Sequence, residues 1–391
     1  MTQPPAKGTY FTYFPDDYRW SAAMNIIIST GQWGGSDMGE VDQVGRRLAR
    51  KLGDDGLWFR EWVRMGDKVR ALGMAEERKG HPLSAAAHHK RACNYYLMGE
   101  RFRVKKDKKA LAAYRKVLDS FRRFARLSDR PRIELVDVPY EKGKKLPGYF
   151  VHAENTRKAK PPVVVFFDGL DGTRELLYLI GVESLVRRGM SCLILDGPGQ
   201  GEAIRFRKIY LCHDYEKAGS AALDYLETRK DVNARRAGVL AISLGGYFAP
   251  RIASLDRRYK ACAAWGAIWD YHAVWKRRIE AAFKVALPVP GHFINWTLNA
   301  ASLDASLEKL EDFRLDGVVQ KMRCPFLLTH GGRDSQIPLR DARALFRAVG
   351  SKDKTLKIFT AAEGGAQHCQ TDNLSLGTTV IFDWLQEKLR A

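Results

Sequence analysis

The sequence predicts an α/β fold with a mostly parallel sheet, and three observations support this. From residue 131 onward, eight short β-rich runs alternate with segments of helical pattern. Most of these runs are continuously apolar, as strands buried on both faces of a parallel sheet are. The residues before 131 carry apolar side chains at three- and four-residue spacing, which predicts helices. Together these patterns indicate a doubly wound α/β domain that follows a helical N-terminal region.

The predicted helical N-terminal region covers residues 1–130. It contains "DMGEVDQVGRRLARKL", "GLWFREWVRMGDKVRALGMAEERKG" and "HPLSAAAHHKRACNYYLMGERF". Glycine and proline separate these segments, as they commonly do between helices. In the basic block at 101–132, apolar residues recur at near-helical spacing between lysines and arginines. This block predicts an amphipathic helix with a solvated basic face.

The predicted α/β core covers residues 131–270 and 322–391. Its first two runs, "RIELVDVPY" and "LPGYFVHA", alternate in polarity and are joined by "EKGKK", which predicts an antiparallel hairpin at the sheet edge. The buried runs that follow are "PVVVFFDG", "SCLILDGPG", "GVLAIS", "KACAAWGAI", "PFLLTHGGRD" and "TLKIFTA". Residues 271–321 interrupt the alternation with a helical, aromatic segment broken by Pro288 and Pro290. We expect this insertion to form a lid.

Composition restricts the classes of partner. The chain has 391 residues and a net charge of +20, but no nucleic-acid-binding motif, so the basic helix face accounts for the charge without a nucleic-acid partner. The N-terminus lacks a signal-peptide pattern, and no apolar stretch reaches the length of about 18 residues that spans a bilayer. We therefore expect a cytoplasmic protein without a membrane partner. The six cysteines are scattered singly, which favours reduced thiols over a metal or redox site.

Three side chains suited to nucleophilic catalysis follow predicted strands. Ser243 follows "GVLAI", Asp334 follows "PFLLTHGGR", and His368 lies in "AAEGGAQHCQ" after the last run. Histidine can take the proton of a serine hydroxyl while a carboxylate holds the imidazole in place. The chain order Ser, Asp, His is that of α/β-hydrolases. His330 competes with His368 as the base, but it lies inside a strand-like run, where a structural role is favoured.

The residues around Ser243 fit a sharp strand-to-helix turn. The pattern is A-x-S-x-G, with Ala241 and Gly245 two positions either side of Ser243. Small residues are needed there because larger side chains would collide with a nucleophile in strained backbone geometry. The amide of Leu244 then points at the substrate oxygen, and a second donor is expected near Gly169 and Leu170.

Further motifs carry a resemblance to a known family. They are "FFDGLDGTRELL", "DGPGQGEA", "AISLGGYFAPRIAS", "AAWGAIWDY", "THGGRDSQIPL" and "GGAQHCQTDN". Together they resemble the α/β-hydrolase group that contains 2,6-dihydroxypseudooxynicotine hydrolase, the fungal hydrolases that shorten polyketide chains, and the FrsA-like esterases. The resemblance implies an α/β-hydrolase fold of about eight strands with an inserted helical lid, often in a homodimer. It assigns the triad to Ser243, Asp334 and His368, and the oxyanion loop to "DGLDG".

The resemblance also implies hydrolysis of either a carbon–carbon bond beside a ketone or an ester. The C–C hydrolases resembled here use an additional acid from the lid region, for which this chain offers Asp270 or Glu280. Lid aromatics predict an apolar wall for an aromatic substrate, with ordinary lid packing as the alternative; they are Trp269, Tyr271, Trp275 and Trp296.

The preferred interpretation is a serine hydrolase that cleaves a C–C bond of a ketone or β-diketone through an acyl-enzyme. An esterase is the alternative. A peptidase or acyl-peptide hydrolase is less favoured, because its cap would need carboxylates to hold a substrate amine and the N-terminal region is basic. A non-catalytic binding protein is the remaining alternative. The expected partner is a small carbonyl compound, and this chemistry needs no metal or organic cofactor.

Overall fold

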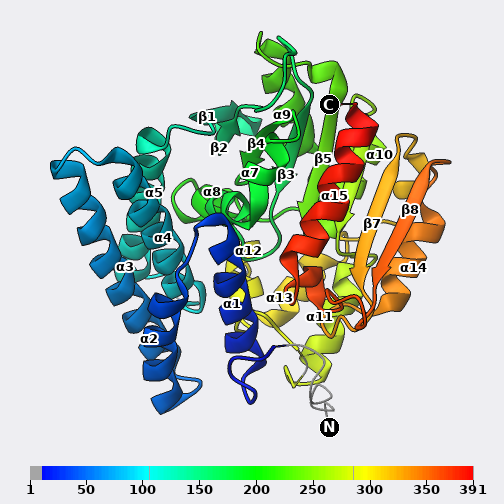
Figure 1. Cartoon of the computed structure of the whole chain (residues 1–391). Helices are drawn as coiled ribbons and strands as arrows, with labels where there is room; N and C mark the ends of the chain where they lie inside the picture. Colours follow the sequence, from blue (N-terminus) through cyan, green and yellow to red (C-terminus); the bar gives the residue numbers. More distant parts are fainter. Residues whose placement is uncertain (1–10, 105, 285, 391) are drawn as a thin grey trace.

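An eight-stranded sheet forms the centre of the protein (Figure 1). The computed structural model describes residues 11–104, 106–284 and 286–390. The strands are β1 (Ile133–Pro139), β2 (Lys145–Val151), β3 (Val163–Phe167), β4 (Ser191–Leu195), β5 (Ala237–Ile242), β6 (Ala261–Trp265), β7 (Phe326–Gly331) and β8 (Lys354–Phe359). Their order is β1-β2-β4-β3-β5-β6-β7-β8. Strands β3 to β8 run parallel, whereas β2 is antiparallel to both β1 and β4. The mostly parallel sheet and the edge hairpin predicted from the sequence are confirmed.

Alternate residues of the central strands point to opposite faces of the sheet. In β5, Val239 and Ala241 belong to one buried hydrophobic cluster, while Leu240 and Ile242 belong to the other. Because both faces are covered, β5 needs an apolar residue at every position. This explains the continuous apolar runs of the sequence.

Helices of the core cover the two faces of the sheet. They are α6 (Arg174–Leu177), α7 (Glu183–Val186), α8 (Gly201–Arg205), α9 (Glu216–Thr228), α10 (Gly245–Leu255), α14 (Leu339–Ala348) and α15 (Leu374–Leu389). Helices α9, α10 and α14 contribute to the cluster that contains Val239. Helices α7 and α15 contribute to the cluster on the other face.

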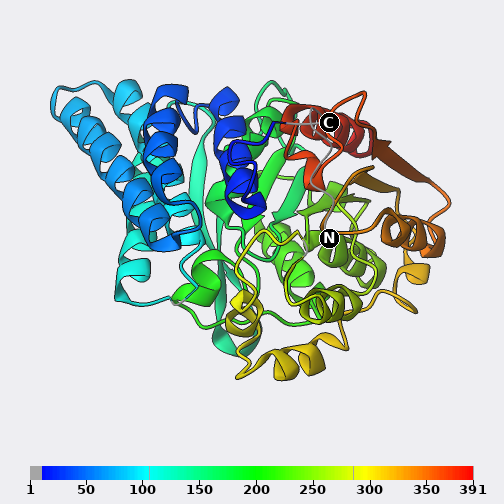
Figure 2. The same ribbon diagram turned by 90° about the horizontal axis from the view of Figure 1, so that it is seen from below.

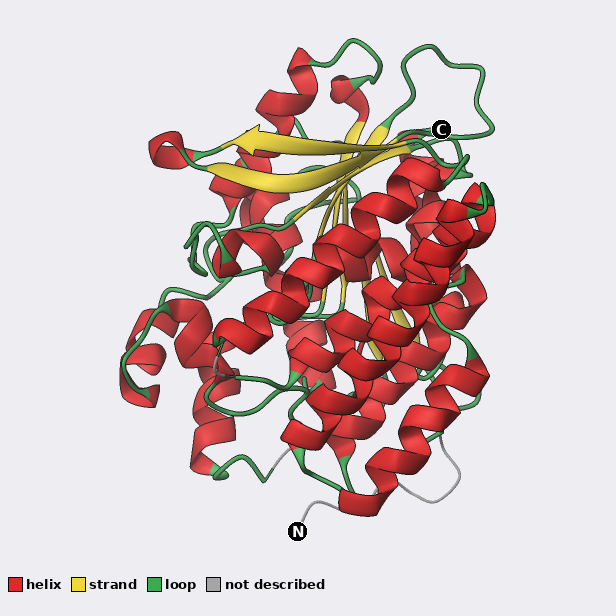
Figure 3. Ribbon diagram, turned by 90° about the vertical axis from the view of Figure 1, so that its left-hand side faces the viewer, coloured by secondary structure: helices red, strands yellow, loops and turns green. Residues whose placement is uncertain are grey.

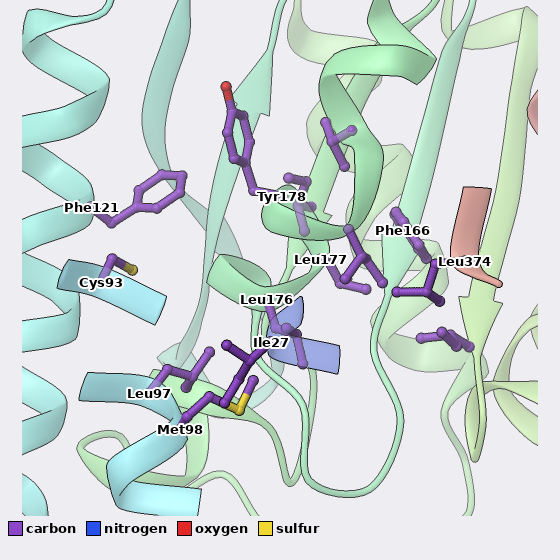
Figure 4. Close-up of a cluster of buried hydrophobic side chains, with 14 of the residues drawn as sticks. Ile27, Cys93, Leu97, Met98, Phe121, Phe166, Leu176, Leu177, Tyr178 and Leu374 are labelled. Carbon is purple, nitrogen blue, oxygen red and sulfur yellow. The ribbon is translucent and has the colours of Figure 1, made fainter. Parts of the chain in front are cut away.

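The N-terminal helices pack on the face that also carries α15. They are α1 (Tyr18–Ser29), α2 (Met38–Leu48), α3 (Asp55–Arg78), α4 (Pro82–Arg101) and α5 (Lys108–Leu127). Viewed from their side, they lie in front of the sheet (Figure 3). One buried cluster joins Ile27 of α1, Leu97 of α4 and Phe121 of α5 to Leu177 and Leu374 of the core (Figure 4). The predicted basic amphipathic helix is α5. The first ten residues of the predicted N-terminal region lie outside the described part of the chain.

The segment between β6 and β7 holds the predicted lid. It contains α11 (Tyr271–Glu280), α12 (Phe293–Leu298) and α13 (Leu303–Leu310), and Figure 2 shows it from below, where α12 and α13 are yellow. Pro288 and Pro290 lie in the connection between α11 and α12. The domain boundaries themselves stay a prediction. No helix among the described residues is both long and apolar enough to cross a membrane.

Candidate active site

Ser243 occupies a strained turn at the carboxyl end of β5. Strand β5 ends at Ile242 and helix α10 begins at Gly245, so only two residues make the turn. The φ angle of Ser243 is 61°, in the left-handed region that costs energy for a residue with a side chain. The amide of Ser243 donates to the carbonyl of Trp265 on β6 at 2.8 Å. The sheet thus fixes the turn that presents the Ser243 hydroxyl.

The small residues around Ser243 have a direct steric reason. A Cβ atom at Gly245 would lie 2.5 Å from the Cβ of Ala241, closer than two carbons can approach. A Cβ at Gly246 would lie 2.4 Å from the carbonyl oxygen of Gly266. The turn therefore tolerates a methyl group at position 241 because position 245 has none.

A chain of hydrogen bonds links the three candidate catalytic residues. The Oγ of Ser243 lies 2.8 Å from Nε2 of His368. The Nδ1 of His368 lies 2.7 Å from Oδ2 of Asp334. The other carboxylate oxygen of Asp334 accepts the amides of Gln336 at 2.8 Å and Ile337 at 2.9 Å. Asp334 follows β7 and His368 follows β8, so parallel strand ends bring the three residues together.

The negative charge of Asp334 and the positive charge of protonated His368 stabilise each other. Burial opposes the charged carboxylate of Asp334, but the nearby imidazole of His368 lowers the net pKa of Asp334 below its ordinary value. Burial likewise opposes the imidazolium of His368, yet the carboxylate of Asp334 raises the pKa of His368 well above its ordinary value. An imidazole held in this way can accept a proton from Ser243 and keep the resulting charge.

His330 does not take part in this chain. It is fully buried in β7, and its Nε2 lies 3.1 Å from the carbonyl oxygen of Ile337. Its Nε2 is also 3.8 Å from Oδ2 of Asp334, and burial lowers the pKa of His330. His330 therefore packs behind Asp334, in line with the structural role favoured from the sequence.

The loop after β3 lies against Ser243. A Cβ at Gly169 would be 2.8 Å from the Cβ of Ser243, so only glycine fits there. The side-chain amide of Gln200 donates to the carbonyls of Asp168 at 2.5 Å and Gly169 at 2.9 Å, which fixes the loop. However, the amide of Gly169 itself donates to Oδ1 of Asp168 at 2.6 Å.

The three predicted oxyanion donors therefore differ in whether their backbone amides are already hydrogen-bonded. Among the described residues, neither the amide of Leu244 nor that of Leu170 has a hydrogen-bond acceptor. The amide of Gly169 is already engaged by the side chain of Asp168. The amides of Leu244 and Leu170 thus stay unpaired within the described part of the chain, although neither residue lines the cavity next to Ser243, whereas Gly169 provides space.

A cavity with about 660 Å³ of space free of atoms opens at Ser243 and His368. Its aliphatic lining comes from several elements: Ala22 and Ile26 of α1, Leu176, Ile180, Ile242, Pro288 and Leu374. Its polar lining comprises Arg101, Asp168, Asp171, Gln336 and Thr371, beside Ser243, His368 and Cys369. The N-terminal helices thus supply more of the lining than the segment predicted as a lid, which contributes only Pro288 among the described residues.

The four predicted pocket aromatics lie outside this lining. Trp275 is fully buried and Tyr271 is 3% exposed, both within the hydrophobic cluster behind β5. Trp269 and Trp296 pack against the same cluster as partly buried residues. Their apolar surface holds the lid helices on the core, which is the ordinary lid packing weighed as the alternative.

The two predicted auxiliary acids also lie elsewhere. Asp270 accepts the amide of Ala273 at 2.8 Å as the N-cap of α11 and pairs with Arg314 at 3.4 Å. Glu280 is exposed at the end of α11. Neither lines the cavity. A strand end in the sequence identified Asp270 as a candidate, but its side chain turns back to start the next helix.

Sequence reasoning missed the charged residues that do line the cavity. Asp168 and Asp171 belong to "DGLDG", a motif that predicts an oxyanion loop through its backbone amides and not through its carboxylates. Their position directly after a buried strand was the available signal. Arg101 ends helix α4, far away in the sequence, and no local pattern distinguishes it from the other basic residues.

No group of three or more His, Cys, Asp or Glu side chains that could hold a metal ion occurs in 11–104, 106–284 and 286–390.

Comparisons with known proteins agree with this fold. Residues 51–360 match the family described as Esterase FrsA-like. Hydrolase LUC6 of a Fusarium species is 30% identical, over 92% of this chain and 94% of its own length. The 20-hydroxy-prefusarin hydrolase FUS2 of Gibberella moniliformis is 28% identical, over 92% of this chain and 94% of its own.

A solved structure extends the likeness to three dimensions. The crystal structure of 2,6-dihydroxy-pseudo-oxynicotine hydrolase superposes with a TM-score of 0.76 at 22% identity, covering 93% of this chain and 95% of that one. Because the match spans nearly the whole chain, it includes the N-terminal helices as well as the α/β core.

Proposed function

Since this chain belongs to the FrsA-like esterase family and is an α/β-hydrolase, we propose that it cleaves a C–C bond next to a carbonyl group, in a ketone or β-diketone. Ser243 is the nucleophile, His368 the general base and then acid, and Asp334 the residue that orients His368. The observation that carries this proposal is the hydrogen-bond chain from Ser243 Oγ through His368 to Asp334 at the cavity wall.

The first chemical step is the attack of Ser243 on the substrate carbonyl. His368 takes the hydroxyl proton, and the imidazolium is stabilised by the buried carboxylate of Asp334. The tetrahedral oxyanion accepts the amides of Leu244 and Leu170, which have no other acceptor among the described residues. Collapse of this intermediate leaves an acyl group on Ser243. Water then attacks the acyl group with His368 again as the base, which releases a carboxylic acid.

The leaving group decides between the two candidate reactions. An ester expels an alkoxide, which the imidazolium of His368 can protonate. A ketone must expel a carbanion, which needs an adjacent carbonyl to take the electron pair or a further polar group in the cavity. The charged side chains of the cavity support the C–C reaction, because plain ester hydrolysis does not require them.

Ester hydrolysis is the second candidate function. The family description names an esterase, and neither Asp270 nor Glu280 reaches the cavity as an auxiliary acid. Both reactions use the same three residues.

The expected substrate is a small carbonyl compound with an apolar body. The cavity lining is largely aliphatic, which supports a general apolar substrate rather than the aromatic one expected from the lid tryptophans. One relative is named as a hydrolase of 20-hydroxy-prefusarin, which supports a small-molecule substrate here. A homodimer, implied by the family resemblance, is part of this proposal and is tested by light scattering of the purified protein.

A side-by-side screen tests the proposed function. The purified protein is assayed against p-nitrophenyl esters and aryl 1,3-diketones, together with Ser243→Ala. We expect hydrolysis of at least one class, with a loss of about 10⁴-fold or more in kcat for the variant. A fluorophosphonate probe should label the native protein and not Ser243→Ala. A folded native protein that is neither labelled nor active would contradict the proposal.

A further inference from the structure

Arg101 brings a buried positive charge to the cavity wall. It ends helix α4, and its side chain is 8% exposed. The nearest guanidinium nitrogen, Nη2, lies 2.5 Å from Oδ2 of Asp171. The Nε of Arg101 is buried and has no hydrogen-bond partner among the described residues. The ion pair with Asp171 therefore leaves part of the donor capacity of the guanidinium unused, and Arg101 is one of the residues that line the cavity.

The position of Arg101 is fixed by its neighbour in the sequence. Glu100 is fully buried and accepts Nε of Arg205 at 3.0 Å and Nη2 of Arg205 at 2.7 Å. The Nζ of Lys106 lies 2.7 Å from Oε1 of Glu100. The ion pair with Arg205 attaches the end of α4 to α8 of the core, and the pair with Lys106 holds Glu100 from within the N-terminal region. The backbone of Arg101 is therefore held in a fixed position beside the cavity.

Beside Ser243 and His368, the charged side chains that line the cavity are Arg101, Asp168 and Asp171. Arg101 and Asp171 form the ion pair, and Asp168 lies in the same loop as Asp171. Burial raises the pKa of Asp168 to about 7, so part of this carboxyl is protonated at neutral pH. The remaining lining is largely aliphatic. A substrate that fits both parts has an apolar body and an oxygen that carries negative charge during the reaction.

We propose that Arg101 binds the enolate oxygen of the leaving group, so that the preferred substrates are 1,3-dicarbonyl compounds. This inference rests on the proposed function, since it needs Ser243 as the nucleophile. It adds a residue from the N-terminal helices to the site and explains how the carbanion is stabilised without an acid from the lid.

The proposed step balances as follows. Ser243 Oγ forms a bond to one carbonyl carbon and gives its proton to His368. The bond between that carbon and the central carbon of the 1,3-dicarbonyl breaks. Its electron pair moves to the second carbonyl, whose oxygen becomes the enolate oxygen beside Arg101. The imidazolium of His368 then protonates the central carbon, which yields a ketone and the acyl-enzyme.

Two substitutions of Arg101 test this role, with 1-phenylbutane-1,3-dione and p-nitrophenyl butyrate as probes. Arg101→Met should lower the ratio of kcat/KM for the diketone to kcat/KM for the ester by about 10- to 150-fold, the loss expected for one charged hydrogen bond. Arg101→Lys, which keeps the charge, should recover part of this ratio. Arg251→Met is the matched control, because Arg251 pairs with Glu216 on α9 and does not line the cavity.

A spectroscopic test separates binding from turnover. In Ser243→Ala the diketone stays intact, but its central carbon can still release a proton to the solvent. Because Arg101 would stabilise the resulting enolate oxygen, we expect the bound diketone to show enolate absorbance at a lower pH than the free diketone does. Adding Arg101→Met should remove that absorbance, whereas adding Arg251→Met should not. The variant Asp171→Asn frees Arg101 from its carboxylate and should increase the enolate fraction.

The outcomes distinguish this inference from the proposed function. Equal losses on diketone and ester in Arg101→Met, with no change in the enolate spectrum, would overturn the inference alone. Hydrolysis of esters without any hydrolysis of diketones would also overturn it, while leaving a serine hydrolase. Only a folded native protein without activity or labelling of Ser243 would overturn both.

Discussion

Ala241 and Gly245 face each other across the turn that carries Ser243, and a Cβ at Gly245 would lie 2.5 Å from that of Ala241. A side chain at position 241 and one at position 245 would occupy the same small space. A methyl group at position 241 is compatible with the turn only while position 245 carries none, which is why A-x-S-x-G forms the same turn as G-x-S-x-G.

This relationship predicts the outcome of a double substitution. Gly245→Ala should destabilise the protein by about 1–3 kcal/mol, because the added methyl group overpacks the turn. Ala241→Gly alone should have a smaller effect, and Ala241→Gly with Gly245→Ala should recover part of the loss. Thermal unfolding and kcat of the three variants measure this. Additive effects of the two substitutions would show that the methyl groups do not compete.

The pH dependence of activity should reflect the pair of His368 and Asp334. Only neutral His368 can accept the proton of Ser243, so kcat/KM falls as the pH drops below the pKa of His368. Because the carboxylate of Asp334 raises the pKa of His368 above its ordinary value of 6.5, we expect the acidic limb above pH 6.5. In Asp334→Asn this limb should move to lower pH, and kcat should fall by about 10⁴-fold. An unshifted limb in the variant would assign the limb to another group.

Gly169 should be required for its lack of a side chain. In Gly169→Ala the new methyl group would lie 2.8 Å from the Cβ of Ser243 and 3.0 Å from the carbonyl oxygen of Ile242. We expect this contact to displace the nucleophile and lower kcat by about 10²-fold, the effect of a small misplacement. Gly39→Ala is the control, because its nearest atom would be 3.4 Å away. Circular dichroism of both variants checks that the fold is kept.

The buried charge of Glu100 should stabilise the contact between the N-terminal helices and the core. Glu100→Gln removes the only carboxylate that the described residues place within ion-pair distance of Arg205 and Lys106. Removing one partner of a buried ion pair costs about 3–5 kcal/mol. The exposed pair of Glu227 and Arg258 provides the control, since Glu227→Gln should cost less than about 1 kcal/mol. Urea unfolding compares the two, and equal small losses would contradict the prediction.

Local sequence determined the sheet and the site at its edge. The apolar runs are continuous because β3 to β7 are covered on both faces, and this pattern is visible without coordinates. Ser243, Asp334 and His368 could be predicted to lie together because parallel strands bring their carboxyl ends to one edge. The requirement for small residues at positions 241 and 245 followed from the geometry of the turn alone.

The lining of the cavity could not be determined in this way. The lid tryptophans have the composition of a pocket wall, but large apolar side chains equally stabilise the packing of helices, and here they do so. Asp270 follows a strand as the proposed catalytic residues do, yet it caps α11.

Residues whose positions depend on their neighbours in the sequence or on parallel strand ends could be predicted without coordinates. Which side chains reach the cavity from outside the α/β core depends instead on contacts between elements that lie far apart in the chain. Arg101 reaches it because α4 is attached to the core through the ion pair of Glu100 with Arg205, a contact between residues about a hundred positions apart. The position of Arg101 follows from packing between distant segments, which no local pattern records.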